Sequence, residues 1–173
     1  MTALTRTPQN TNPLQATKFL LTFDRISTIT YFCQTTNLPG VSLGEVERST
    51  PFIEQFSPGT KLKYESLDIS FIVNEDLSSW KNLYDWFLSI ANPDGFDGRN
   101  NVPGISTKAY KYFSDAKLVV LSALNNPIVA IDFKNVFPVS MSGLDFDTTT
   151  DANKIITCNA TFRYESYNYL TQA

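Results

Sequence analysis

The chain has 173 residues, enough for one domain of ordinary size, and 42% of them are hydrophobic, so a real core can form. Fourteen Lys and Arg against 17 Asp and Glu give a net charge of −3, which argues against a nucleic-acid-binding protein held by a basic surface. There is no histidine, which excludes Ser-His and Cys-His catalysis and His-ligated metal sites. We therefore expect no enzyme, no cofactor and no metal.

The first residues predict an extended arm. Residues 1–16 are rich in Thr, Asn and Pro, and we expect them to precede a single domain over residues 17–170. This start has no apolar run typical of a signal peptide, and no stretch approaches the roughly 18 apolar residues of a membrane helix. We expect a soluble protein made in a cytoplasm, without membrane insertion.

Two alternating segments open the expected domain. Apolar residues at every second position predict one strand at 19–23 and another at 29–34. A turn at residues 24–25 would join them into a first hairpin. Leu38-Pro39-Gly40 should end the second strand, because proline cannot donate to a strand ladder and Pro-Gly favours a turn.

Residues 41–63 allow two interpretations. Two prolines bracket two phenylalanines and an isoleucine in this segment. The segment is either a hydrophobic loop folded back on its own core, or a projecting hairpin whose apolar tip meets another subunit, since exposed apolar patches usually mark interfaces. The residue pattern alone does not choose between them.

A strand followed by a helix is expected next. Alternation predicts a strand over residues 67–73, and apolar residues at helical spacing predict a helix over residues 77–91. The polar residues 74–76 between them suit a helix N-terminus because Asn74 is a good capping residue and acids are favoured there. Trp86 lies off the centre of the apolar stripe.

Residues 92–107 have the composition of a polar loop, with three Gly and two Pro. Asp94 and Asp97 suggest a calcium site, but the segment lacks the ligand spacing and the closing Glu of an EF-hand. A plain polar loop is the better interpretation.

The second half of the chain predicts more strands. Residues 117–123 and 128–133 should pair as a hairpin around Asn125-Asn126-Pro127, and a short strand over residues 136–139 should break at its proline. Residues 156–164 alternate most clearly of all, with Cys158 on the apolar side. Cys158 and Cys33 are best explained as small buried thiols without a reactive role.

Together these elements predict a mainly β (α+β) fold. We expect an antiparallel β-sandwich or barrel of about seven strands with one flanking α-helix. Glycine-rich phosphate loops, Walker motifs and zinc-type spacings are absent from the sequence, so nucleotide binding has no support.

Several segments resemble contractile-tail (myovirus, T-even-like) phage tail tube proteins, a family that includes tube-like baseplate initiators. The first is the run from residue 18 through Leu38-Pro39-Gly40. The second is the strand that ends at Asn74, followed by a helix that carries Trp86. The third is the ending, residues 136–140 and 155–164. The similarity covers about residues 17–168 and lies in the order and spacing of the segments.

The resemblance implies a structural virion protein with a tail-tube-like fold. Such a protein self-assembles into stacked, hexameric rings that form the inner tail tube, through which phage DNA is ejected without sequence-specific binding. Its partners would be the tail sheath and the baseplate, its place the virion tail, and its site of synthesis the host cytoplasm. A tube initiator or another baseplate protein of the same fold is the alternative.

The resemblance also favours the interface interpretation of residues 41–63. In the family this segment is a hairpin that contacts neighbouring subunits or the next ring. The expected interface residues are therefore Val46, Phe52, Ile53, Phe56 and Pro58.

Two functions from other classes remain as competing hypotheses. One is a monomeric β-barrel that binds a small apolar ligand within its aromatic interior. The other is an enzyme that uses carboxylates alone, such as a glycosidase with two acids across a cleft. The acidic residues of the sequence form no recognisable catalytic constellation.

Overall fold

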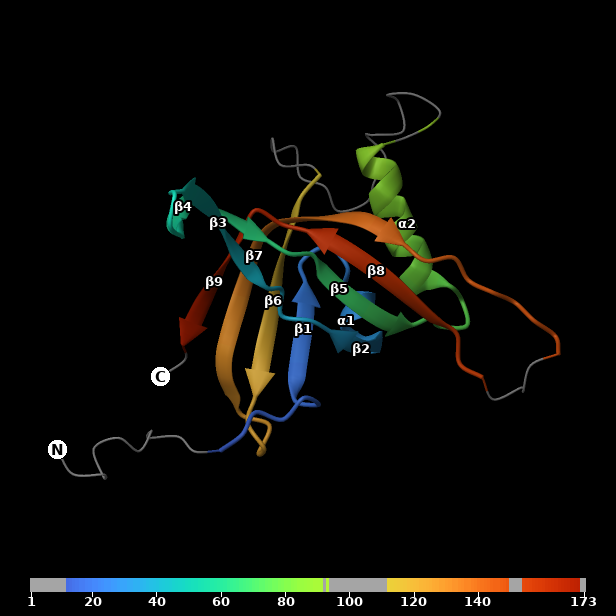
Figure 1. Ribbon diagram of the computed structural model, residues 1–173. Coiled ribbons are helices and arrows are strands. Elements are labelled where there is room, and N and C mark those ends of the chain that lie inside the picture. The colour runs from blue at the N-terminus through green and yellow to red at the C-terminus, as the bar shows by residue number, and fades with distance from the viewer. Residues whose placement is uncertain (1–11, 92, 94–111, 150–153, 172–173) are drawn as a thin grey trace.

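The computed structural model describes residues 12–91, 93, 112–149 and 154–171, and it is built mainly from strands (Figure 1). Every strand pair in this part of the chain is antiparallel, so the predicted fold class is confirmed. The described residues form nine strands and two helices, whereas the sequence pattern predicts about seven strands and one helix. In chain order the elements are β1 (Phe19–Phe23), α1 (Ser27–Phe32), β2 (Cys33–Thr36), β3 (Val41–Ser49), β4 (Glu54–Tyr64), β5 (Leu67–Ile72), α2 (Ser78–Ile90), β6 (Ser114–Leu121), β7 (Pro127–Met141), β8 (Thr157–Arg163) and β9 (Ser166–Thr171).

The longest strand, β7, joins two parts of the main sheet. From Pro127 to Val136 it pairs with β6 on one edge, from Val129 to Lys134 it also pairs with β9 on the other, and its last residues pair with β8. The strand order is β1-β6-β7-β8-β5-β2, with β9 beside β7. Figure 1 shows β5 and β8 running obliquely across the part formed by β1, β6 and β7. The two parts of the sheet thus enclose a common core.

Alternation along the strands sends one set of side chains into this core. Leu21, Phe23 and Leu118 come from the β1–β6 side, and Phe71 and Phe162 come from β5 and β8; all are buried. The ring centroids of Phe23 and Phe162 are 5.0 Å apart, so the aromatic side chains of the two sheet parts meet directly. Because each aromatic ring buries a large apolar area, this cluster holds the two parts together.

The predicted first hairpin, over residues 19–34, is wrong. β1 pairs with β6 instead, and the segment that follows β1 forms the short helix α1 before it reaches β2. The spacing of the buried residues explains the difference. Ile26 and Ile29, three positions apart, are both buried, whereas Tyr31 is 84% exposed. In a strand, Ile29 and Tyr31 would share one face.

Two further differences concern β7 and the last strand. The sequence predicts a break at Pro138, but β7 continues past it with a neighbouring bulge. Pro138 is paired with β8 and lies beyond the last residue paired with β6, so a residue without an N–H is tolerated there. The sequence prediction also lacks β9, whose Tyr167 packs against Phe133 and Tyr164.

The helix α2 is confirmed, but its buried face differs from the predicted stripe. Trp86, expected off the centre of that stripe, is 1% exposed and belongs to the core with Leu83. Two serines complete the buried face, and both hydroxyls are satisfied. Ser79 Oγ donates to Asn74 Oδ1 and Ser89 Oγ donates to Trp86 O, each at 2.7 Å. A face that includes buried serines is hard to recognise from hydrophobicity alone.

The start of α2 depends on Asn74, which lies before the first helical residue. Its Oδ1 accepts a hydrogen bond from the backbone N–H of Ser79 at 2.9 Å, in addition to the bond from the serine hydroxyl. This satisfies one of the N–H groups that a helix N-terminus leaves without a partner. The N-cap position itself is occupied by Leu77, with a left-handed φ of 57°, so the sequence predicts the capping side chain of Asn74 but not the first residue of the turn.

We expect Asn74→Ala to lower the free energy of unfolding by about 1–2 kcal/mol, because the buried N–H and hydroxyl of Ser79 lose their acceptor. Urea unfolding followed by circular dichroism, at equal protein concentration, measures this change. The exposed neighbour Glu75 offers a matched control, since Glu75→Ala should change the stability by less than about 0.5 kcal/mol. Equal effects of the two substitutions would contradict the capping role.

The prediction of small buried thiols is confirmed for Cys158, whereas Cys33 is only partly buried. Cys33 and Cys158 are free, and they lie opposite Phe71 on its two sides, in β2 and β8. Burial raises the pKa of Cys33 to about 11 and also raises the pKa of Cys158, which keeps both in the thiol form. The segments 1–11 and 94–107, which include Asp94 and Asp97, lie outside the described residues.

Candidate assembly surface

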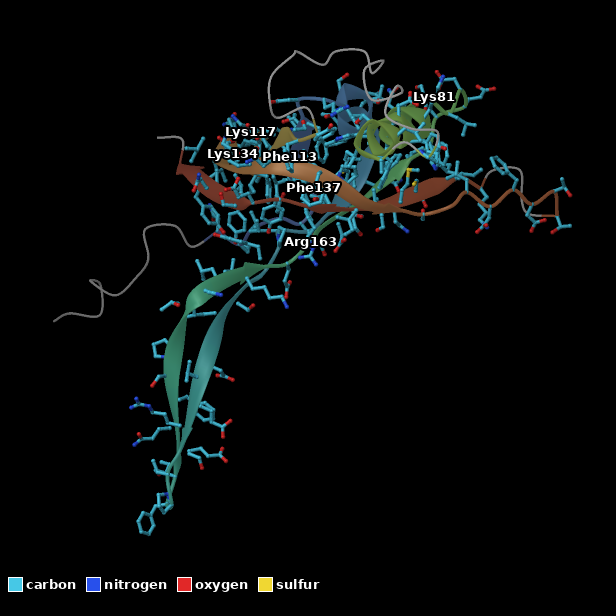
Figure 2. The ribbon with its side chains drawn as sticks, turned by 90° about the horizontal axis from the view of Figure 1, so that it is seen from above. Lys81, Phe113, Lys117, Lys134, Phe137 and Arg163 are labelled. Atoms are coloured by element: carbon cyan, nitrogen blue, oxygen red, sulfur yellow. The ribbon has the colours of Figure 1, made fainter. Side chains whose placement is uncertain are left out.

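The strands β3 and β4 pair only with each other and form a hairpin that stands away from the rest of the protein, which we call the body (Figure 2). Apart from Gly59 and Tyr64, every residue of the two strands is exposed. At about 3.4 Å for each residue, β3 alone spans about 30 Å. The interpretation of residues 41–63 as a loop folded back on the core is therefore wrong, and the segment projects.

The base of the hairpin is fixed to the body by hydrogen bonds and by aromatic packing. The N–H of Glu65 donates to Gly40 O at 3.0 Å and closes the base of the hairpin, and Arg163 Nη1, from the body, donates to Tyr64 O at 3.2 Å. The ring centroids of Tyr64 and Tyr167 lie 5.3 Å apart. Because the body contacts both the backbone and the ring of Tyr64, it fixes the direction in which the hairpin projects.

The tip of the hairpin presents apolar side chains to solvent. Phe52 is 98% exposed, and Ile53 and Phe56 are 62% and 60% exposed. Thr50 closes the turn beneath them: its N–H donates to Ile53 O at 3.1 Å, and its Oγ1 accepts from the Ile53 N–H at 3.2 Å. Fully burying each such side chain against a partner would contribute about 1.5–3 kcal/mol. A closed, apolar, projecting turn is the kind of surface that a partner covers.

A bulge bends the hairpin near its base. Leu43 pairs with Leu62, and Glu45 pairs with Pro58. Between these two pairs β3 has one residue, whereas β4 has three, so β4 bulges. A Cβ on Gly59 would lie 2.4 Å from the carbonyl oxygen of Gly44, so the two strands approach too closely for any other residue at position 59. In Figure 2 the distal part of the hairpin turns away from the direction of its base.

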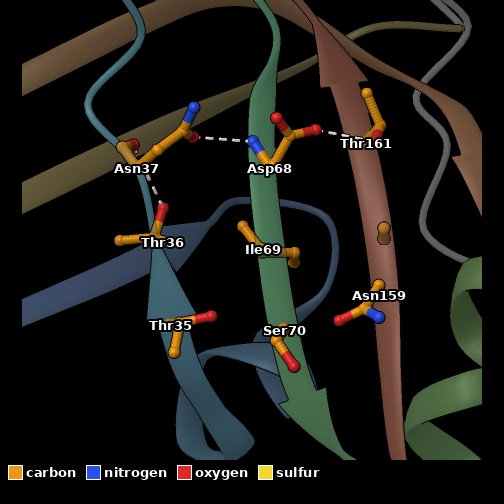
Figure 3. A pocket seen from close by; sticks show the side chains of 9 residues that line it. Thr35, Thr36, Asn37, Asp68, Ile69, Ser70, Asn159 and Thr161 are labelled. Carbon is orange, nitrogen blue, oxygen red and sulfur yellow. Dashed lines mark hydrogen bonds between the residues drawn. The ribbon is translucent and has the colours of Figure 1, made fainter.

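An open polar groove of about 430 Å³ lies over β2, β5 and β8 (Figure 3). Asp68 is the one charged side chain among its described lining residues, and its carboxylate accepts from the hydroxyls of Thr161 at 2.7 Å and Ser66 at 3.2 Å. The Asp68 N–H donates to Asn37 Oδ1 at 2.7 Å. Since the carboxylate is engaged and has no second titratable partner in this lining, the groove lacks the paired groups of acid–base catalysis.

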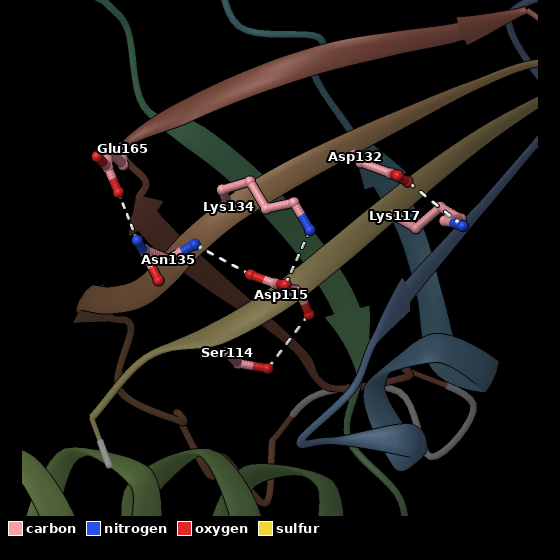
Figure 4. Close-up of polar contacts among 7 residues, drawn as sticks. All are labelled: Ser114, Asp115, Lys117, Asp132, Lys134, Asn135 and Glu165. Carbon is pink, nitrogen blue, oxygen red and sulfur yellow. Dashed lines mark hydrogen bonds and ion pairs between the residues drawn. The ribbon is translucent and has the colours of Figure 1, made fainter. Parts of the chain in front are cut away.

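A polar cluster on β6 and β7 is structural (Figure 4). Asp115 accepts from Lys134 Nζ and from the backbone N–H of Asn135, both at 3.1 Å, and it raises the pKa of Lys134. Asn135 has a φ of 53°, a left-handed conformation that asparagine tolerates, and its side chain donates to Glu165. These hydrogen bonds connect the bulged region between β6 and β7 to Glu165, which comes directly before β9.

The aromatic interior is packed, contrary to the hypothesis of a ligand-binding barrel. The ring centroids of Trp86 and Phe162 are 5.9 Å apart, and both side chains are buried. An apolar hollow of about 670 Å³ lies instead at the edge, near the β6–β7 turn, where Leu14, Leu124 and Tyr169 border it. The aromatic core therefore serves the fold.

The exposed hairpin therefore suggests a protein that associates with a partner, and the grooves and clusters described above give no support for catalysis. Over the described residues there is no group of three or more His, Cys, Asp or Glu side chains placed to hold a metal, and no helix has the length and apolar character to cross a membrane. The family model for phage tail tube proteins matches residues 7–170. The chain belongs to this family.

Individual relatives agree with this tail tube assignment. The tail tube terminator protein of Enterobacteria phage T4 is 26% identical over 163 residues, which cover 88% of this chain and 86% of the relative. A chain of the anti-feeding prophage baseplate shares the fold with a TM-score of 0.66 and 15% identity, over 94% of this chain and 98% of that chain. The cap that terminates the anti-feeding prophage tube has a TM-score of 0.64 and 15% identity, over 99% and 100% of the two chains.

The motif residues of the chain position the hairpin and α2. Within Leu38-Pro39-Gly40, which leads from β2 into the hairpin, Pro39 is buried and its carbonyl accepts from Tyr167 Oη at 3.4 Å. The Asn74 side chain caps the first turn of α2, and Trp86 fills the core. The expected interface residues lie away from these, together on the hairpin, and their contact role stays a prediction; they are Val46, Phe52, Ile53, Phe56 and Pro58.

Sequence reasoning missed two further apolar residues on the hairpin. Leu43 and Leu62 lie opposite each other near its base and are exposed. Their signal was present in the sequence, because each alternates with polar neighbours, but the pair becomes visible only once the register of β3 and β4 is known.

We expect Gly59→Ala to disorder the hairpin and Gly44→Ala to leave it intact. The added Cβ at position 59 would collide with a backbone carbonyl, whereas a Cβ on Gly44 has no atom within 4 Å. Trypsin cleavage at Lys61 and Lys63 should become about tenfold faster in Gly59→Ala, because the local opening becomes easier. Equal cleavage rates in the two variants would contradict a close approach at this bulge.

Proposed function

We propose that this protein assembles with copies of itself into a ring of the inner tube of a contractile phage tail. The projecting hairpin with its apolar tip carries the proposal, because a monomer leaves this surface in water and a ring or a stack of rings covers it. The open ends of the main sheet support it as well. β2 ends the sheet with one partner strand, and a ring can pair or cover such an edge.

In this proposal the rings are hexameric and stacked, and DNA passes through their lumen during ejection without sequence-specific binding. The net charge of −3 supports this, since a basic wall would hold the phosphates. The partners are tail sheath and baseplate proteins, the host cytoplasm is the place of synthesis, and the virion tail is the final location. Membership of a structural family supports a role without catalysis or cofactor.

A ring that terminates the tube is the second candidate. One observation favours it: the T4 relative, which is matched over 86% of its length, is named a tail tube terminator. The likeness to the anti-feeding prophage cap shows the fold and is consistent with this role. A tube initiator in the baseplate would be built on the same kind of ring.

Negative-stain electron microscopy of the purified protein, with its mass measured in solution, tests the proposal. Stacked rings or long hollow tubes would support the repeating tube subunit. Single rings that bind the ends of preformed tubes would support the terminator. A strict monomer at all concentrations, even with neighbouring tail proteins added, would contradict self-assembly.

A further inference from the structure

Strand alternation places every acidic residue of the hairpin on one side. Glu45 and Glu47 are two positions apart in β3 and so share a face. Glu54 joins them, because it lies opposite Ser49, which follows the same alternation. We call this side the acidic face. It also carries Phe56, which lies opposite Glu47.

The bases of the hairpin lie on the other side. Arg48 alternates with the glutamates along β3, and Val46 shares its side. Lys63 lies opposite Ser42, which belongs to the same alternation as Arg48, and Lys61 is two positions from Lys63. We call this side the basic face. In Figure 2 the side chains leave the hairpin on two opposite sides.

Among the residues that the structure describes, these charges have no ion-pair partner within one copy of the protein. The ion pairs that the structure shows among the described residues lie on β6 and β7, and none involves residues 41–64. The acidic and basic faces point in opposite directions, so a hairpin cannot neutralise its own charges. Separated, unpaired and complementary faces on one projecting element suggest that each face meets the other in a neighbouring copy.

We propose that the acidic face of one hairpin lies on the basic face of the hairpin of the next copy, a contact that rests on the proposed ring assembly. A two-fold contact between identical faces would bring glutamates against glutamates, or bases against bases, and would be repelled. A head-to-tail contact brings opposite charges together and repeats in one rotational direction around the ring. Phe56 on one face and Val46 on the other add apolar area to the same contact.

The division of charge therefore selects the symmetry of the assembly. Charged groups at a contact contribute more to orientation and partner choice than to affinity, which here would come from the apolar residues. High salt screens such exposed charges, so the proposal also predicts that assembly becomes less selective for the head-to-tail arrangement as the salt concentration rises.

Two charge-reversal variants test the proposal. Glu45→Lys, Glu47→Lys and Glu54→Lys together make both faces basic, and Arg48→Glu, Lys61→Glu and Lys63→Glu together make both faces acidic. We expect each variant alone to lose ring formation, with at least a hundredfold weaker association in sedimentation experiments. An equimolar mixture of the two variants should regain it, as should a single chain that carries all six reversals. Because these side chains are exposed, circular dichroism and the melting temperature of the unassembled chains should match the wild type.

Rescue by the mixture or by the sixfold reversal supports contact between opposite faces. Two outcomes would overturn this contact if the wild type forms rings: each variant alone also forms rings, or neither the mixture nor the sixfold reversal restores them. Either outcome would leave the proposed tube function unaffected. A wild-type protein that never assembles would overturn both proposals.

Discussion

Replacing Phe52, Ile53 and Phe56 together with serine should abolish the proposed assembly, within rings through Phe56 and between rings through the tip, and leave the body folded. The three side chains are mostly exposed in one copy, so their loss removes no core contact. If each is buried at a subunit contact, the loss is about 1.5–3 kcal/mol for each side chain, which weakens association by several powers of ten. Sedimentation velocity and negative-stain microscopy measure the association, and the melting temperature reports on the fold.

A leucine variant tests whether assembly depends on the apolar character of the tip or on its aromatic rings. Phe52→Leu with Phe56→Leu keeps apolar side chains at the tip and should retain most of the assembly. The serine variant and the leucine variant should have the same melting temperature when they are unassembled. Filaments that persist in the serine variant would show that the tip is not the stacking contact.

The elements that could be predicted from the sequence are those with one solvent-exposed face and one buried face. β8 alternates strictly between apolar and polar residues, and β5 does so as far as Phe71, because one side of each strand packs on the core. In these strands the order of neighbouring residues shows which side is buried. For α2 the helical period predicts the helix but not the buried face, which includes Ser79 and Ser89.

The parts that could not be predicted depend on partners distant in sequence. β1 pairs with β6, with Phe19 opposite Val120, and no local pattern reports a pairing across so many residues. A strand that has no local partner leaves the following segment free to form α1, which buries Ile29, while Ile26 is buried at the N-cap position just before it. β9 is similar: it pairs with β7 and not with its neighbour in sequence.

For the hairpin, the sequence predicts which residues are apolar but not whether they face the core or a partner. An apolar segment such as residues 51–58 has the same composition whether it folds inward or waits for a partner, because the sequence of one copy does not show the other copies. The register of β3 and β4 removes that ambiguity, and it also separates Glu45 and Glu47 from Arg48. The charge division of the hairpin is thus a property of pairing and not of composition.

The largest loss of stability is expected for Trp86→Ala, about 3–5 kcal/mol, because a large buried side chain leaves a cavity that the core cannot fill. Three interactions disappear with it. Its ring packs on Phe162 at 5.9 Å, the Arg25 guanidinium lies 5.2 Å from its ring centroid, and its Nε1 donates to Tyr112 O at 3.0 Å. The cavity and the loss of this hydrogen bond act in the same direction. Urea unfolding followed by circular dichroism, at equal concentration because association adds to apparent stability, measures the loss.

The second tryptophan of the same helix is the control, because it has the same size in a different setting. Trp80 is only partly buried and stacks on the exposed Tyr84, with centroids 5.3 Å apart, so Trp80→Ala should cost about 1–2 kcal/mol. Trp86→Phe, which keeps a ring in the core and loses the N–H, should fall between the two alanine variants. Equal losses for Trp80→Ala and Trp86→Ala would mean that α2 packs through its hydrophobic stripe, as the sequence predicts, and not through the face that carries Ser79, Leu83 and Trp86.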